Sequence, residues 1–276
     1  MLAFGLFIPV MPQYLVEITG KPAEETVLMG GFLMFTFGVI NFLTMPIIGN
    51  LSDRFGRRPV LMVSIAGLCI DFIIMGFAHS LFALFIGRAL AGITSATYST
   101  ANSYIADVTE PEDRGRAYGM IGAAFGFGFV IGPGIGGLLG SIDVRLPFFV
   151  AAGIAACNFL YGAFVLPESL DKENRRPFEL RRANPFGALK HFSKLPKVGW
   201  FIVAVGIYAI SHAVFPATWS WHGDIRYDWS EAQIGFSLAL VGIGSAVVQA
   251  MLAGRMTKTL GPTKTATIGL SVTIIS

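Results

Sequence analysis

Long apolar stretches of about 20 residues recur along this chain, and short polar connections separate them. A helix needs about 20 apolar residues to cross a bilayer, and in lipid only a helix or a closed barrel satisfies its own backbone hydrogen bonds. We therefore predict eight membrane-spanning helices and the start of a ninth. The expected spans are 1–16, 28–48, 59–79, 81–103, 117–140, 147–166, 198–220 and 232–253, then a stretch from residue 265.

Composition and charge agree with this reading. The chain is 54% hydrophobic and only 13% charged, whereas a soluble domain carries roughly 25% charged residues. Most of the 20 lysines and arginines fall in the loops on one side of the predicted spans, which places those loops in the cytoplasm. The net charge of +3 therefore indicates orientation and not nucleic-acid binding. The predicted fold class is an all-α polytopic membrane protein.

A polar, proline-rich segment divides the chain. Residues 167–197 are predicted to form a cytoplasmic linker between a six-helix half, 1–166, and the start of a second half, 198–276. The glycine spacing of "GNLSDRFGRRP" returns in "GRMTKTLGP", after the second span of each half. Two parallel six-helix halves are a common design among secondary transporters. The chain is expected to be a fragment, incomplete at both ends.

The segment between the second and third spans is an abrupt polar hinge. Glycines permit a tight turn there, and Arg57 can pair with a carboxylate through two hydrogen bonds. Asp107, at the cytoplasmic end of the fourth span, is the expected partner, and for Arg58 a purely topological role is the alternative. The predicted conformational latch consists of Gly49, Asp53, Arg54, Gly56, Arg57, Arg58 and Asp107.

The fifth span has a face of small residues. Glycines recur there every four positions, and small residues let helices approach closely, while Pro133 is expected to bend the helix. The eighth span offers a matching small face, so we expect the two halves to touch here; static packing is the alternative. The residues that carry this prediction are Gly128, Gly132, Pro133, Gly136, Gly137 and Gly140.

Two charged residues lie deep in the predicted spans. Asp71 precedes the turn near Ser80 by nine residues, and Arg88 follows it by eight. At about 1.5 Å per residue they lie at similar depth on neighbouring helices and can pair. Because a buried charge is costly, such residues are paired or functional. A structural ion pair and a role in handling protons or substrate are both open.

Polar residues after Arg88 predict a cavity. Thr94, Tyr98 and Asn102 recur at four-residue spacing on one helix face, where lipid would not favour hydroxyls and amides. His212 and Phe215 in the seventh span and Gln249 in the eighth are further candidates for a substrate path, and Gln13 and Asn41 are weaker ones. A packing role is the alternative for His212.

Enzyme chemistry finds no support in the sequence. The glycines of the fifth span are not followed by a phosphate-binding lysine, and the chain has neither a metal-ligand spacing nor a nucleophile–base pair. Cys69 and Cys157 lie inside spans, where a free thiol behaves as a small apolar residue. We predict a protein that is not an enzyme and that holds no cofactor and no metal.

Several of these motifs resemble those of a known family. "GNLSDRFGRRP" and "LFIGRALAG" are similar to signature segments of the major facilitator superfamily, and "GFVIGPGIGG" resembles the motif of its proton-linked exporters. "SYIADVTEPEDRGRAYG" and "FVLPES" resemble the tetracycline-resistance efflux group. The resemblance implies a major facilitator fold, with a latch that holds the outward-open state and a central path bordered by the first, fourth and seventh helices.

The same resemblance implies a function. It is export of an amphipathic drug, with tetracycline as a candidate, by proton antiport in a multi-pass monomer of the bacterial inner membrane. The implied partners are this small molecule, protons and lipid, without nucleic acid. The alternatives are a proton-coupled uptake transporter and a transporter-like receptor. The chain departs from the group at Ser245 and Thr273, where titratable residues are expected, and leaves Asp71 as the main visible proton carrier.

Overall fold

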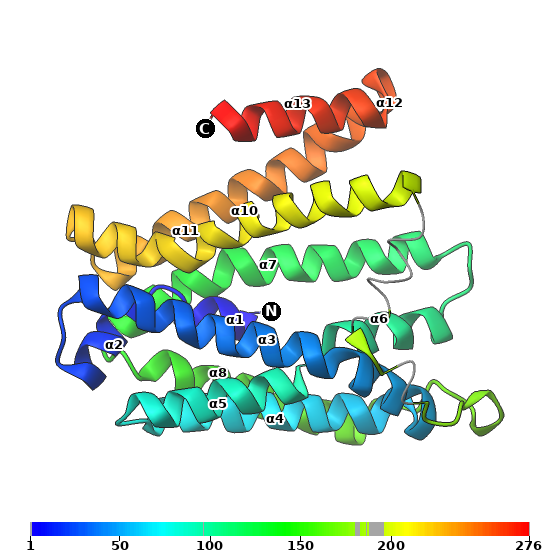
Figure 1. Ribbon diagram of the computed structural model, residues 1–276, viewed down its shortest axis with the longest axis horizontal. Helices are drawn as coiled ribbons and strands as arrows, with labels where there is room; N and C mark the ends of the chain where they lie inside the picture. The colour runs from blue at the N-terminus through cyan, green and yellow to red at the C-terminus, as the bar shows by residue number, and fades with distance from the viewer. Residues whose placement is uncertain (1, 96, 180–182, 186, 188–195, 276) are drawn as a thin grey trace.

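The computed structural model describes residues 2–275 apart from 96, 180–182, 186 and 188–195, and within these ranges the chain is all-α (Figure 1). Residues 2–108 form α1 (Leu2–Phe7), α2 (Met11–Thr19), α3 (Ala23–Phe55), α4 (Arg57–Phe77), α5 (Leu81–Thr94) and α6 (Thr97–Val108). The later elements are α7 (Arg114–Gly140), α8 (Leu146–Phe164), η1 (Lys172–Asn174), α10 (Pro196–Tyr227), α11 (Glu231–Val247), the π-helix η2 (Val248–Ala253), α12 (Gly254–Leu260) and α13 (Pro262–Ile275).

Five helical stretches in the described part of the chain are long and apolar enough to cross a membrane. They are α3, α4, Leu81–Val108 (α5 with α6), α7 and α8. Their order matches the second to sixth predicted spans, so the prediction of a polytopic helical membrane protein is confirmed.

Two predicted spans are interrupted. The first is divided into α1 and α2 next to Pro9. Pro12 lies in the first turn of α2, where its missing N–H costs no helical hydrogen bond. The fourth span breaks at Ser95, the C-terminal cap of α5. The prediction of one continuous helix over 81–103 is wrong, because its polar second part starts a new helix at Thr97.

The expected polar hinge is a single residue. α3 continues to Phe55 and α4 begins at Arg57, so only Gly56 separates them, with φ +109°. Gly261 separates α12 from α13 in the same way, with φ +81°. L-residues with side chains rarely adopt such angles, which explains why glycine recurs at both turns. The two turns support an internal repeat.

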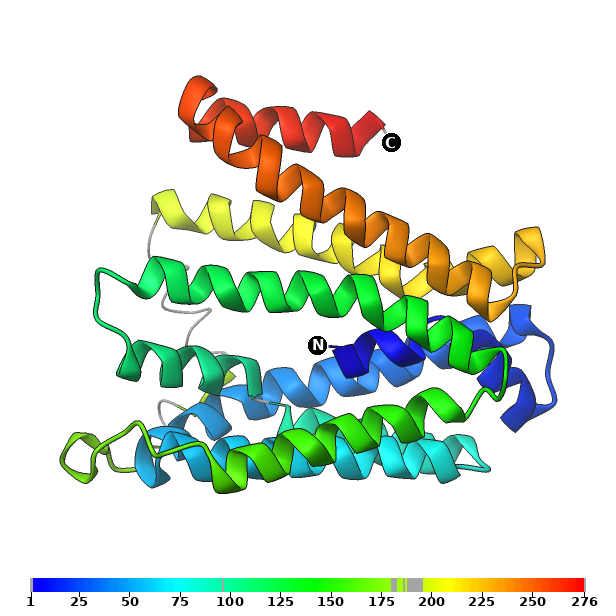
Figure 2. The same ribbon diagram turned by 180° about the vertical axis from the view of Figure 1, so that it is seen from behind.

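The helices pack around α7 and a buried aromatic core. Figures 1 and 2 show α7 between the α10–α11 hairpin and the group formed by α4, α5 and α8. The core of the first half lies where α1 and α2 meet α4 and α8. Phe7 stacks on Phe148 with ring centroids 6.0 Å apart, and the hydroxyl of Tyr14 donates to the carbonyl of Met75. Phe72 is fully buried beside them.

Two arginines tie the antiparallel helices α4 and α8 together at opposite ends. Arg58, at the start of α4, donates from Nη2 to the carbonyl of Ala163 at the end of α8, at 2.5 Å. Arg145, just before α8, donates from Nη1 to the carbonyls of Gly76 (3.1 Å) and Ala78 (2.8 Å) at the end of α4. Each arginine satisfies carbonyls that a helix C-terminus leaves without partners. The purely topological reading of Arg58 is therefore too narrow.

The glycines of α7 let three helices approach closely. A Cβ atom added to Gly132 would lie 2.8 Å from the Cα of Gly5 in α1, and one added to Gly136 would collide with the backbone of Leu6. On the adjacent face of α7, a Cβ added to Gly235 of α11 would lie 3.0 Å from the Cα of Gly137. The helix α7 is therefore in backbone contact on two sides.

This arrangement corrects the expectation for the row of glycines at four-residue spacing. Gly132 and Gly136 pack against α1 within their own half, and Pro133 and Gly137 meet α11. The predicted contact between the fifth and eighth spans exists, but a different face of α7 makes it. A helix offers several faces, and tertiary packing alone selects the partner of each.

We predict that Arg145→Met lowers the thermal unfolding midpoint of the full-length protein in detergent. The substitution leaves the carbonyls of Gly76 and Ala78 without a charged donor, which costs about 1.5–3 kcal/mol per hydrogen bond to a charged group. It also removes the 2.8 Å ion pair with Glu17. Arg54→Met is the matched control. The guanidinium of Arg54 lies 5.1 Å over the ring of Phe55, its neighbour on the same helix, so losing this contact does not separate two helices. Equal midpoints for the two variants would contradict the capping role.

We also predict that Gly136→Ala destabilises the protein whereas Gly126→Ala, on the same helix, does not. A Cβ at Gly136 meets the backbone of Leu6, while one at Gly126 has open space around it. Overpacking against backbone costs typically 1–3 kcal/mol or more, and alanine otherwise favours a helix over glycine. Thermal unfolding followed by size-exclusion chromatography measures both. Similar behaviour of the two variants would show that α1 and α7 separate easily.

Candidate functional site

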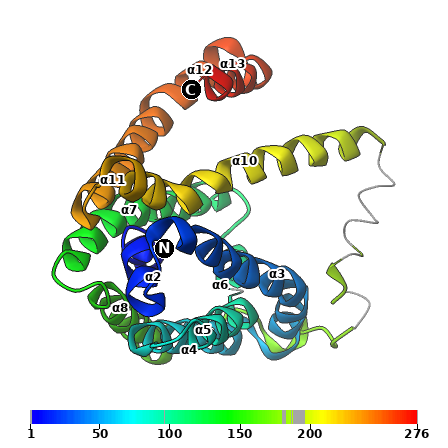
Figure 3. The same ribbon diagram turned by 60° about the vertical axis from the view of Figure 1, so that its left-hand side comes forward.

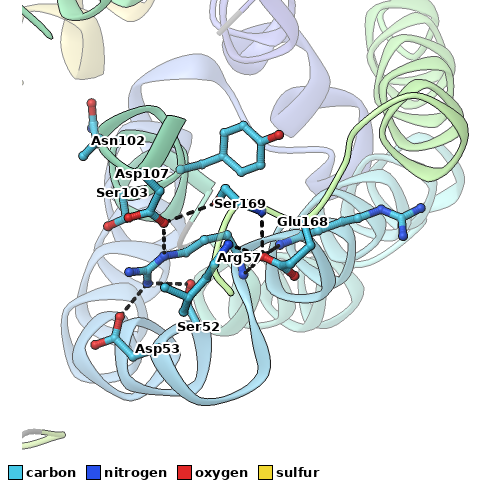
Figure 4. Close-up of polar contacts among 12 residues, drawn as sticks. Ser52, Asp53, Arg57, Asn102, Ser103, Asp107, Glu168 and Ser169 are labelled. Atoms are coloured by element: carbon cyan, nitrogen blue, oxygen red, sulfur yellow. Dashed lines mark hydrogen bonds and ion pairs between the residues drawn. The ribbon is translucent and has the colours of Figure 1, made fainter. Parts of the chain in front are cut away.

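An arginine joins three helices at their cytoplasmic ends. Arg57, the first residue of α4, contacts Asp53 of α3 (Nη1 to Oδ1, 2.6 Å) and Asp107 of α6 (Nε to Oδ2, 3.0 Å). Its Nη1 also donates to Oγ of Ser52 at 3.1 Å (Figure 4). The predicted partnership of Arg57 and Asp107 is thus present. Both carboxylates accept hydrogen bonds from the guanidinium group and balance its charge.

A residue that physical reasoning on the sequence missed completes the cluster. The Oε1 atom of Glu168, beyond α8, accepts from the backbone N–H groups of Arg57 (2.8 Å), Ser169 (3.0 Å) and Leu170 (3.1 Å). A carboxylate at a helix N-terminus satisfies free N–H groups and is attracted by the helix dipole. Figure 4 shows Glu168 beside Arg57 on the side away from Asp53. The sequence signals this residue only through the segment "FVLPES", which resembles the tetracycline-resistance efflux group.

Gly56 is required by both its conformation and this neighbour. A Cβ added there would lie 2.7 Å from the carboxyl carbon of Glu168. Gly49 is different, because a Cβ there meets nothing within 4 Å. Gly49 is therefore not a point of close helix approach, and it lies inside α3 and not at the turn.

The first part of the predicted linker lies against this cluster. The backbone N–H of Arg176 donates to the carbonyl of Asp53 at 3.0 Å, and Nδ2 of Asn50 donates to the carbonyl of Glu179 at 2.7 Å. Ser169 adds a hydrogen bond from its hydroxyl to Asp107 at 3.3 Å. Residues 168–179 therefore cover the cytoplasmic end of α3 and connect the end of α8 to the latch.

A small polar cavity of about 140 Å³ adjoins the latch. It is lined by Gly49, Ser52, Asp53, Arg57, Ser99, Thr100 and Ser103. The buried hydroxyl of Thr100 has no hydrogen-bond partner among the described residues. A polar face of α6 thus lines a cavity as expected, but with different residues and next to the latch.

The predicted polar face of the fourth span is not one face. Thr94 lies on α5, before the break, and packs against Gly67 of α4; its hydroxyl donates to its own helix at Leu90 (2.9 Å). Asn102 lies on α6, where its backbone carbonyl accepts a hydrogen bond from the hydroxyl of Tyr118 at 3.5 Å. The grouping fails because the helix breaks between the two residues. The side chain of Tyr98 lies outside the described structure.

Asp71 and Arg88 form the predicted ion pair inside the membrane-spanning region. Nη2 of Arg88 donates to Oδ2 of Asp71, and both side chains are buried. The guanidinium of Arg88 also lies 5.2 Å over the ring of Phe7. Oδ1 of Asp71 and Nε of Arg88 have no hydrogen-bond partner among the described residues. The pair is incompletely satisfied, which is unusual for buried charged groups.

The remaining substrate-path candidates are only partly located. Phe215 is half-buried on α10 and packs on Trp219 of the same helix, with ring centroids 4.8 Å apart. The side chains of His212, Gln249 and Thr273 lie outside the described structure. Gln13 contacts Asp224, and Oδ1 of Asn41 is buried without a partner among the described residues. Among the described residues, Phe215, Gln13 and Asn41 do not line the cavity beside the latch.

Comparisons with known proteins agree with this architecture. The sequence model of the Major Facilitator Superfamily matches residues 1–276. The chain is 40% identical to the class C tetracycline resistance protein of Escherichia coli (97% of this chain, 67% of that protein) and 35% identical to the class G protein of Vibrio anguillarum (98% and 68%). It is 28% identical to multidrug resistance protein 2 of Bacillus subtilis (94% and 64%). The chain therefore spans about two thirds of the length of these relatives.

A solved structure shows the same fold. The human organic anion transporter MFSD10 superimposes with a TM-score of 0.70 at 24% identity, over 92% of this chain and 69% of that one. At this identity the likeness concerns the fold alone. The helices and the family match confirm the prediction of a multi-pass membrane protein, and the bacterial relatives favour the inner membrane. The chain belongs to the major facilitator superfamily of membrane transporters.

Proposed function

We propose that the full-length protein exports an amphipathic, drug-like small molecule in exchange for protons, by alternating access. The carrying observation is the buried Asp71–Arg88 pair in a chain of this transporter family. A titratable carboxylate held by a single arginine inside the membrane-spanning region is suited to taking up and releasing a proton. Membership in a transporter family also agrees with the prediction that the protein is not an enzyme.

Proton uptake at this pair has a structural consequence. A proton on Asp71 neutralises the carboxylate and weakens its attraction for Arg88, so the arginine then favours other partners. Oδ1 of Asp71 and Nε of Arg88 have unused hydrogen-bonding capacity, which favours an alternative arrangement. Phe7 of α1 lies against the arginine, so a change at the pair reaches the helix that packs on α7.

The cytoplasmic cluster supports alternating access. Asp53, Arg57 and Asp107 hold α3, α4 and α6 together through one guanidinium group, and Glu168 caps α4 beside it. A charge cluster at a pivot contributes differently to two conformations, and it thereby sets their populations. We assign residues 1–166, 167–197 and 198–276 to the first half, the linker and the start of the second half.

Tetracycline is a candidate substrate because of the relatives named above. Ser245 and Thr273 cannot titrate near neutral pH, so within this chain proton coupling rests on Asp71. The similarity to multidrug resistance proteins favours testing several amphipathic drugs together. Uptake of a solute is the opposite direction of transport, and the same vesicle assay distinguishes it.

We predict that Asp53→Asn reduces drug export by about tenfold or more while membrane insertion stays normal. The change removes the charge that holds Arg57 at 2.6 Å, and a hydrogen bond to a charged group is worth about 1.5–3 kcal/mol. Glu112→Gln, in the exposed loop before α7, is the matched control. Export by vesicles containing each full-length variant is the measurement. Unchanged export by Asp53→Asn would remove the latch from the mechanism.

We predict that a pH gradient across such vesicles drives drug export and that Asp71→Asn abolishes this dependence. Asparagine cannot carry a proton, although it can still accept a hydrogen bond from Arg88. Tetracycline and several unrelated amphipathic drugs are followed with the gradient present and after an ionophore collapses it. Export that ignores the gradient in the unmodified protein would contradict proton antiport. Export of other drugs without tetracycline would restrict the error to the substrate.

A further inference from the structure

The end of α10 that is predicted to face the periplasm is attached to the first half of the chain by three polar contacts. The hydroxyl of Ser220 donates to the carbonyl of Ile8 at 2.9 Å. Nε1 of Trp221 donates to Oγ1 of Thr26 at 3.2 Å. Beyond them, Nε2 of Gln13 donates to Oδ1 of Asp224 at 2.8 Å. All three join α10, which follows the linker, to segments that precede it by about 200 residues.

The contacts of Ser220 and Trp221 are buried from water. Thr26, Ser220 and Trp221 are 0%, 1% and 4% exposed. The indole of Trp221 occupies the space beside Gly30 of α3, where an added Cβ would lie 2.5 Å from Cζ2. Only glycine leaves room for the ring. Because the indole ring fits beside Gly30, this contact fixes the position of α10 relative to α3.

The opposite end of α10 runs away from the first half. Figures 1 and 3 show α10 close to α2 and α3 at its C-terminal end and increasingly distant from α3 toward Pro196. The two halves of the chain are therefore joined at the predicted periplasmic end and diverge toward the cytoplasmic end. This is the arrangement of a transporter that is closed to the periplasm. The latch is nevertheless formed, because its members all lie within the first half; the implied role in holding the outward-open state is not supported.

We propose that Gln13–Asp224, Ser220–Ile8 and Trp221–Thr26 form a periplasmic lock, which closes the path on that side and must open in every transport cycle. The lock rests on the alternating-access part of the proposed function. Its outermost contact is the weakest point, because Asp224 is half-buried while the other contacts are buried. Opening is therefore expected to begin at Gln13–Asp224.

The charges around Asp224 make this outer contact sensitive to protons. Asp224 lies beyond the predicted span 198–220. Burial raises its pKa, the hydrogen bond from Gln13 lowers it, and the negative charges of Glu231 (α11), Asp228 (the turn after α10) and Glu24 (α3) raise it, with a net increase. Two cations at the same end of the bundle pair with other carboxylates: Lys21 with Glu25 at 3.2 Å and Arg145 with Glu17 at 2.8 Å.

The sign of the pH effect follows by linkage. In an open periplasmic side Asp224 is hydrated, and its pKa is lower than in the closed lock. A group with a raised pKa in the closed form stabilises that form when the pH is low, and this contribution is lost as pH rises through the closed-state pKa. Acid on the periplasmic side therefore favours closure, which is the direction in which a proton-driven exporter must return.

The test is a distance measurement between the two halves. Phe82, at the start of α5, and Phe236, on α11, are 75% and 64% exposed, so both accept a spin label when replaced by cysteine. The full-length protein without its native cysteines is compared with Gln13→Ala, Asp224→Ala and the double variant. The label pair is expected to show a short distance in the closed form and a long one in the open form. Each single change is expected to raise the population ratio of the open to the closed form by on the order of tenfold.

The double variant should resemble the larger single variant, because both changes remove the same contact. Lys21→Ala is the matched control, since its ion pair with Glu25 lies on the same side within one half. In an Asp71→Asn background, which removes the other proposed proton carrier, acidic buffer should favour the short distance, and adding Asp224→Asn should abolish this dependence. Additive effects, or unchanged distances in both single variants, would overturn the lock.

The distances are measured without drug or gradient, so they do not depend on the substrate. If the lock variants shift the distances but no drug is exported, the proposed substrate fails and the lock stands. If export is proton-driven but the distances of the Gln13 and Asp224 variants match the control, the lock fails alone. Gln13→Ala leaves every charge in place and thus separates the loss of the contact from a change in charge.

Discussion

Inside a bilayer a polar group must find its partner within the protein, because lipid offers none. Much of this structure follows from that constraint. The side chains of Asp71 and Arg88 meet each other across α4 and α5. At the ends of the helices, where carbonyls lack helical partners, Arg58 and Arg145 supply donors in opposite directions and join α4 to α8. Only 13% of the residues of this chain are charged, and these four have identifiable structural tasks.

A second constraint is the distance between backbones. The glycines of α7 let α1 and α11 approach it on adjacent faces, so that one helix touches the first helix of its own half and a helix of the other half. Where such contacts replace side-chain packing, small displacements cannot be absorbed by rotamer changes. The helix α7 thus contacts both halves at backbone distance, and we propose that the two halves move about these contacts.

The polar clusters at the two ends of the bundle have different characters. On the cytoplasmic side one guanidinium group links three helices, and Glu168 and the start of the linker are packed around it. On the periplasmic side a tryptophan and a half-buried carboxylate join α10 to the first half. The first cluster lies within one half and the second between halves. In the proposed cycle, the periplasmic contacts therefore break when the halves separate, while the cytoplasmic cluster joins helices of a single half.

The sequence by itself determined the class of the protein, the order of its second to sixth spans, and two ion pairs. Hydropathy alone reveals spans, since bilayer thickness sets their length; equal depth on adjacent antiparallel helices was enough to pair Asp71 with Arg88. The pattern could not reveal the break after Thr94, the choice of α1 as the partner of Gly132 and Gly136, or the cap formed by Glu168. It also gave no sign that Gln13 meets Asp224. Only the tertiary structure decided these points, because they depend on which helix faces bring residues distant in sequence into contact, and local periodicity carries no information about the partner of a face.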